Sequence, residues 1–260
     1  MKLTLNGTVV NDDDKWLYDW FKISAFSPRN VREALAELPF DEPLELEVNS
    51  GGGSVWAGFE IYSILRQTAA DTVAVVQSLA ASAASTIICG AKRVKLSPVA
   101  QLMIHLPMTT TSGNRDDHRD SIKVLDSIED SILNGYVSKC GGKTTRDELR
   151  RMLHNSTWLS AEEAVNIGLA DEILYTDGET DATIAGIVNS CRDLNTLFNS
   201  CGFSPCTADL LKRYEHAVRN GAAPAEGHPV NPVPLAADAA KNTTEDWTLR
   251  ARLDLEKLRY

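Results

Sequence analysis

Three groups of residues in this sequence have the types and spacing for acyl-transfer chemistry. Ser82 stands in a block of small residues, 78–86, between a β-rich run and an apolar helical pattern. His105 follows twenty-three residues later, and a run of three glycines, 51–53, precedes both. A serine at a helix N-terminus can be a nucleophile, because free backbone N–H groups there favour developing negative charge. Taken alone, the small residues also fit a tightly packed helix whose serines only let backbones approach.

The glycine run and the histidine each have a second interpretation. The glycines lie between a strand pattern and a helix pattern. They either supply positive φ in a flexible turn or let a ligand come close to backbone N–H groups. Neither G-x-G-x-x-G nor a terminal Gly-Lys-Ser/Thr is present, which makes a phosphate loop the weaker option. His105 is either a general base or a structural histidine at a loop mouth.

Strand and helix patterns alternate around these candidates. Alternating or continuous apolar residues predict strands, and apolar residues at helical spacing predict helices. The predicted strands are 3–10, 44–48, 72–76, 94–96, 101–104 and 172–175, and the predicted helices are 28–38, 55–65, a helix after Ser82, 116–139, 145–153 and 161–167. The aromatic-rich stretch 16–26 is ambiguous. Capping boxes begin at Thr145 and Ser160.

The composition sets the broad class and excludes some partners. The chain has 260 residues, of which 43% are apolar and 24% charged, enough for one large core or two smaller ones. A formal charge of −10 without a Lys/Arg-rich tract argues against a nucleic-acid partner. The longest apolar run, 73–89, contains polar residues and predicts a buried strand and helix rather than a membrane span. The first seven residues lack the apolar core of a signal peptide.

The cysteines give no metal pattern. Five are scattered along the chain, and Cys201 and Cys206 have neither CxxC spacing nor a nearby histidine pair. We therefore expect no metal and no other cofactor, and free thiols in a reducing cytoplasm. For a phage-encoded chain that cytoplasm would be the bacterial host's.

Four short segments, in a fixed order along the chain, together indicate a protein family. They are NSGGGSV at 49–55, AASAA at 80–84, LMIHLP at 102–107, and WLSAEEAV followed by GLAD within 158–171. Together they resemble the Clp protease proteolytic subunit and, more closely, its phage relatives, the head-maturation proteases. The resemblance covers roughly residues 1–176.

The resemblance implies a set of catalytic residues. Ser82 takes the position of the nucleophile and His105 that of the general base. Gly53 and Ala83 take the positions whose backbone N–H groups bind the oxyanion, and Gly52 shapes that loop. These roles agree with a nucleophile at a helix N-terminus and a base at a strand end.

The sequence departs from the family at the third catalytic position. The family has an acidic residue there, and in this chain the position falls on Ser156, preceded by Asn155. A serine or asparagine can orient the histidine ring but brings no charge to the imidazolium. Asp171 matches a different, structural aspartate, and the Asp116-Asp117 pair is the next source of a carboxylate. Gly51 replaces the family's proline, as often in the phage relatives.

The resemblance also implies a fold, an assembly and an activity. The fold is an α/β superhelix of strand-strand-helix units, shared with crotonases, with a protruding helical handle at 116–139. Family members form heptameric or tetradecameric rings, admit unfolded chains and work with AAA+ unfoldases. The implied function is a serine endopeptidase, EC 3.4.21, which uses an acyl-enzyme to process phage capsid or scaffold protein. The alternatives are a catalytically weakened assembly subunit and, third, a crotonase-type acyl-CoA enzyme.

The composition changes after Asp177, which predicts four segments. Residues 1–177 form the peptidase domain, and 178–220 form an extension with helical patterns at 184–198 and 208–218. A Pro/Ala-rich linker at 221–240 and a terminal helix at 241–260 follow. We expect a chain that ends near Asp177 to fold and assemble. The tail either recruits substrate or only aids solubility.

Overall fold

The computed structural model describes residues 1–174, 207–220 and 222. In chain order its elements are β1 Lys2–Val9, α1 Lys15–Trp20, β2 Ala25–Phe26, α2 Pro28–Glu37, β3 Leu44–Gly53, α3 Val55–Gln67, β4 Thr72–Ala81, α4 Ala83–Ile88, β5 Arg93–Leu96, β6 Gln101–Ile104, α5 Arg115–Cys140, α6 Arg146–His154, β7 Thr157–Ser160, α7 Ala161–Ile167, β8 Glu172–Ile173 and α9 Thr207–Arg219. The predicted order is confirmed for these residues, with β7 as an additional strand. The predictions for 184–198, the linker and the terminal helix lie outside the described residues.

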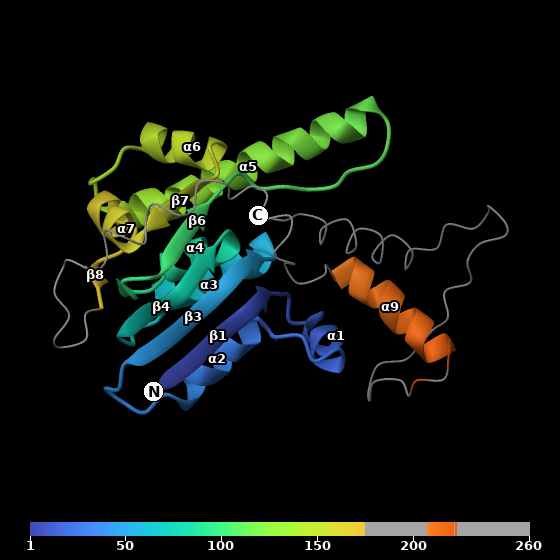
Figure 1. Cartoon of the computed structure of the whole chain (residues 1–260), viewed down its shortest axis with the longest axis horizontal. Helices are drawn as coiled ribbons and strands as arrows, with labels where there is room; N and C mark the ends of the chain where they lie inside the picture. The colour runs from blue at the N-terminus through green and yellow to red at the C-terminus, as the bar shows by residue number, and fades with distance from the viewer. Residues whose placement is uncertain (175–206, 221, 223–260) are drawn as a thin grey trace.

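The described strands form one mostly parallel sheet. Its main order is β2-β1-β3-β4-β5-β8, while β6 pairs with β4 on one side and, antiparallel, with β7 on the other. β4 changes partner along its length, because residues 73–76 pair with β5 and residues 79–81 pair with β6. β4 is thus longer than the predicted strand 72–76. Its second half contains the first part of the small-residue block and lies beside β6 (Figure 1).

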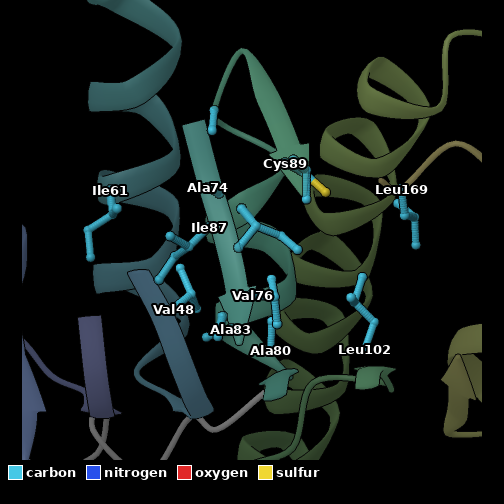
Figure 2. Packing of buried hydrophobic residues seen from close by; sticks show 14 of the residues in the cluster. Val48, Ile61, Ala74, Val76, Ala80, Ala83, Ile87, Cys89, Leu102 and Leu169 are labelled. Carbon is cyan, nitrogen blue, oxygen red and sulfur yellow. The ribbon is translucent and has the colours of Figure 1, made fainter. Parts of the chain in front are cut away.

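Small side chains let the helices pack closely on this sheet. Val48, Val76, Ile61 and Ile87 are each 1% exposed or less and belong to one core cluster, drawn in Figure 2. Full burial of such a side chain stabilises the fold by roughly 1.5–3 kcal/mol. A Cβ added at Gly58 of α3 would lie 3.2 Å from the Cβ of Ala83, and α3 and α4 are therefore in close contact. Close packing is one role of the small residues.

The long helix α5 confirms the predicted handle. Asn114 caps its first turn by accepting from the N–H groups of Asp116 and Asp117, and Gly141 ends it with φ 58°. The first turns are solvent-exposed and extend away from the sheet (Figure 1). The second half packs on the core through Ile132 and Tyr136, both 0% exposed. The helix therefore has a free end and an anchored base.

Helix α9 packs against α1 in a second apolar cluster. The ring of Tyr214 lies edge-on to Trp16 and Trp20, with ring centroids 5.1 and 4.9 Å apart. Leu210 and Leu17 are buried in the same cluster. The predicted helix at 208–218 is confirmed. The ambiguous stretch 16–26 forms α1 and β2; Trp16, Tyr18, Trp20 and Phe21 join the α9 cluster, while Phe26 belongs to the main core.

Candidate active site

Ser82 occupies a sharp turn between β4 and α4. Its backbone has φ 59° and ψ −129°, a conformation that an L-residue adopts at a cost of about 1–3 kcal/mol. Its N–H donates to the carbonyl of Met103 at 2.8 Å. The helix that follows has six residues and is entirely buried. A strained turn of this kind between a strand and a helix presents one side chain away from both elements.

His105 lies directly beyond the end of β6 and next to this turn. Because β4 and β6 are parallel and Ala81 pairs with Met103, the residues after each strand leave the sheet side by side. The Nε2 atom of His105 is 3.0 Å from Oγ of Ser82. The two residues are 4% and 2% exposed. This is the distance at which an imidazole can take a hydroxyl proton.

The glycine loop closes the other side of the turn. Gly52 has φ 95°, and a Cβ added there would lie 2.6 Å from Cβ of Ser82 and 2.9 Å from its Oγ. Gly53 has φ 148°. Of the two interpretations of the glycines, positive φ is confirmed at Gly52 and Gly53, and approach of a ligand to their N–H groups stays a prediction. The structure brings together Ser82, His105 and Gly52, as the sequence predicts.

Ser50 supports this loop and was given no role from the sequence. It is 2% exposed, and its hydroxyl donates to the carbonyl of Gly7 at 2.6 Å. The same hydroxyl accepts from the N–H of Gly52 at 3.1 Å. Gly52 therefore uses its N–H to hold the loop, which agrees with its predicted shaping role. The signal for Ser50 is its position on the buried face of β3, two residues after Val48.

Ser156 lies on the other side of His105. The antiparallel pairing of β6 with β7 joins Ile104 to Thr157, and one further step along this register would bring Ser156 opposite His105. Ser156 has φ 49°, and its N–H donates to the carbonyl of Leu153. The catalytic role of Ser156 stays a prediction.

The nearby polar candidates have other contacts. Asn155 is solvent-exposed at the C-terminus of α6. Oδ2 of Asp171 accepts from the N–H of Val94 and from Nζ of Lys139, both at 2.6 Å, which agrees with a structural role for Asp171. Asp117 accepts from the N–H of Asn114 in the capping box of α5.

The described cysteines are unreactive in character. Cys89 and Cys140 are free and buried. Burial raises the pKa of the Cys140 thiol to about 11 and that of Cys89 further still. Among residues 1–174 and 207–220, no group of three His, Cys, Asp or Glu side chains could hold a metal ion. No helix within these same ranges is long and apolar enough to cross a membrane.

A family model described as Clp protease matches residues 32–177, more than half of the chain. This chain belongs to the Clp protease family. The α/β fold and the family predicted from the four sequence segments are confirmed. Membership supports a peptidase function and favours it over the acyl-CoA alternative.

Bacterial relatives show how far the likeness extends. The ATP-dependent Clp protease proteolytic subunit 1 of Chlamydia muridarum is 32% identical over 176 residues, which cover 63% of this chain and 91% of that protein. The proteolytic subunit of Bacteroides fragilis is 25% identical over 166 residues, covering 62% and 79%. Subunit 2 of Prochlorococcus marinus strain MIT 9312 is 33% identical over 144 residues, covering 54% and 70%.

Proposed function

We propose that this chain is a serine endopeptidase with Ser82 as nucleophile and His105 as general base. The observation that carries the proposal is the 3.0 Å contact between Ser82 Oγ and His105 Nε2 in a buried site. As Oγ attacks the scissile carbonyl, its proton moves to Nε2. The same proton then goes to the leaving amine, and water hydrolyses the acyl-enzyme by the reverse sequence.

The developing oxyanion is bound by the backbone N–H groups of Ala83 and Gly53. Ala83 is the first residue of α4, where an N–H has no intrahelical acceptor. Gly53 follows Gly52, whose backbone lies against the Ser82 side chain. Donors of this kind act on charge that exists only in the transition state and its intermediate, and therefore raise kcat.

Ser156 takes the third position and makes the enzyme slow. One further step along the β6–β7 register would bring it opposite His105, where a carboxylate would stabilise the imidazolium. A serine hydroxyl, or the amide of Asn155, orients the ring without adding charge. Slow turnover suits a single processing event better than continuous degradation.

We propose capsid or scaffold proteins of a phage as the substrates. Gly51 in the glycine loop and the neutral third position support this choice. So does a chain that continues well beyond residue 177, where the family match ends. The extension, as helical segment 178–220, linker 221–240 and terminal helix 241–260, would recruit the substrate. Co-sedimentation of capsid protein with the full chain, compared with a chain that ends at Asp177, tests this role.

We propose a ring-shaped homo-oligomer that acts on unfolded chains in the cytoplasm. The Chlamydia and Bacteroides relatives are named as subunits of ATP-dependent proteases, which supports rings and an AAA+ partner. The buried free thiols Cys89 and Cys140 are compatible with a reducing compartment. Analytical ultracentrifugation should give a heptamer or tetradecamer. A monomer at micromolar concentration would contradict the ring.

Labelling with a fluorophosphonate tests the central proposal. A serine activated by a histidine reacts with the phosphorus centre, and peptide mapping should locate the label on Ser82. His105→Ala is the matched control and should label far more slowly in an oligomer of unchanged size. An assembled wild-type protein that takes up no label would instead be a non-catalytic assembly subunit, the alternative that Ser156 favours. Activity should persist in EDTA, since no step uses a metal.

A further inference from the structure

The peptide unit between Ser82 and Ala83 is held by hydrogen bonds at its carbonyl. The Ser82 carbonyl accepts from the N–H of Ser85 at 3.0 Å and from the Ser85 hydroxyl at 2.6 Å. The Ser85 hydroxyl is in turn 2.7 Å from the hydroxyl of Tyr136 on α5. Ser85 and Tyr136 are both 0% exposed. Two buried hydroxyls thus connect the base of α5 to the backbone of the nucleophile.

The direction of this connection follows from counting protons. A serine hydroxyl has one proton, and a carbonyl oxygen can only accept. Ser85 must therefore donate its proton to the Ser82 carbonyl, and Tyr136 must donate to Ser85. The chain of donors runs from Tyr136 through Ser85 to the Ser82 carbonyl.

The Ser82 carbonyl and the Ala83 N–H belong to the same planar trans peptide. In such a unit the C=O and the N–H point in opposite directions, so fixing the carbonyl fixes the N–H. A hydrogen bond to the carbonyl also polarises the unit and strengthens the N–H as a donor. We propose that Tyr136 is a positioning residue that acts through Ser85 to aim and strengthen the Ala83 N–H toward the oxyanion. This inference rests on the proposed serine-peptidase function.

The framework holds Tyr136 without help from its hydroxyl. Its ring is buried in the main core with Ile132 on the same helix. One turn further on, Lys139 ties α5 to Asp171, which also accepts from the N–H of Val94 on β5. A phenylalanine would fill the same space. The Tyr136 hydroxyl also accepts from the Thr86 hydroxyl at 3.5 Å, so its removal costs some stability, while the buried ring keeps its packing.

The test compares ground-state and transition-state binding in the intact oligomer. For Tyr136→Phe and Ser85→Ala we expect kcat for a peptide substrate to fall about threefold to tenfold, the range of one hydrogen bond, with KM unchanged. The Ki of a peptide boronate, which forms a tetrahedral adduct, should rise by the same factor. The Kd of the cleaved product peptide should not change. The double variant should show no larger a loss of kcat than Ser85→Ala alone, because both changes interrupt the same chain of hydrogen-bond donors.

Tyr18→Phe is the matched control, because it removes a hydroxyl from another buried tyrosine in the α1/α9 cluster. It should keep wild-type kcat and boronate affinity. Wild-type values for Tyr136→Phe would overturn the inference, as would a rise in KM with kcat unchanged. If wild-type protein binds no boronate and takes up no fluorophosphonate, the proposed nucleophile itself is refuted and the inference falls with it.

Discussion

The Ser82 turn and the Ser156 segment, on opposite sides of His105, differ in how many contacts hold them in place. On one side, the Ser82 turn is buried and bonded to Met103 and Ser85, and Gly52 lies against it. On the other side, Ser156 is partly exposed and Asn155 is more exposed, and neither carries a charge. The geometry of attack depends on backbone that the fold holds in place. The charge that would stabilise the imidazolium depends on a single side chain, and the two properties can therefore vary independently.

Removal of the nucleophile should have the largest effect. Ser82→Ala is expected to lower peptide hydrolysis by about four to six powers of ten, as loss of a catalytic serine or histidine does in other serine proteases. The oligomer should keep its size in light scattering, because the hydroxyl contributes little to packing. Cleavage of unfolded protein at the wild-type rate would mean that the nucleophile lies elsewhere.

Crowding the turn from the glycine loop should come next. In Gly52→Ala the new Cβ would lie 2.6 Å from Cβ of Ser82, and the loop must shift. We expect kcat/KM to fall roughly 10²- to 10³-fold, similar to the loss of an oxyanion donor. Gly142→Ala is the control, because Gly142 also has positive φ, 87°, but nothing within 4 Å of the added atom. Equal losses in the two variants would assign the effect to backbone strain.

A negative charge at the third catalytic position, Ser156, should raise the rate of hydrolysis. Ser156→Asp is expected to raise the hydrolysis rate about tenfold, the scale of one charge-assisted hydrogen bond. Ser156→Asn, which has nearly the same shape and no charge, should give little or none of this gain. A lower rate for Ser156→Asp in an assembled oligomer would move the third position elsewhere.

The smallest expected effect is that of Asn155→Ala. If the amide helps to orient the His105 ring, its loss should lower kcat about two- to threefold, since an exposed hydrogen bond contributes little. Steady-state kinetics on the same peptide will measure it. An unchanged kcat would remove Asn155 from the site and leave Ser156 as the single candidate from this segment.

Removal of the extension tests the boundary near Asp177. Among the residues that the structure describes, none of α9 belongs to the main core cluster, so a truncated chain should fold. It would, however, expose the faces of Trp16 and Trp20 that pack on Tyr214. We expect a cooperative melt with increased self-association through α1, seen by light scattering, and weaker association after Trp16→Ser and Trp20→Ser. A truncated chain that yields only aggregate even with these changes would refute an independent domain.

The sequence predicted the elements whose signals are local. The capping boxes at Thr145 and Ser160 fix helix starts through nearby residues, and both were found. The contact of Ser82 with His105 was predicted from the family resemblance, which four short segments in a fixed order carry. Strand β7 was missed, since four residues pair only because β6 lies beside them.

The hydrogen bonds and strand pairing that support the site could not be predicted, because they also depend on residues far apart in the sequence. The bond between Ser85 and Tyr136 joins residues 51 positions apart, and each alone fits an ordinary helix pattern. The length of β4 depends on its change of partner from β5 to β6, which no local pattern records. Both features are properties of tertiary packing rather than of residue propensity.

The left-handed backbone at Ser82 has a consequence for thermal stability. Its φ and ψ are favourable for glycine, which relieves a strain of about 1–3 kcal/mol but adds roughly 0.5–1 kcal/mol of chain entropy to the unfolded state. Ser82→Gly should therefore melt at a higher temperature than Ser82→Ala, although both lack the nucleophile. Catalysis in this fold thus works against folding stability at the residue where peptide-bond cleavage is proposed to begin.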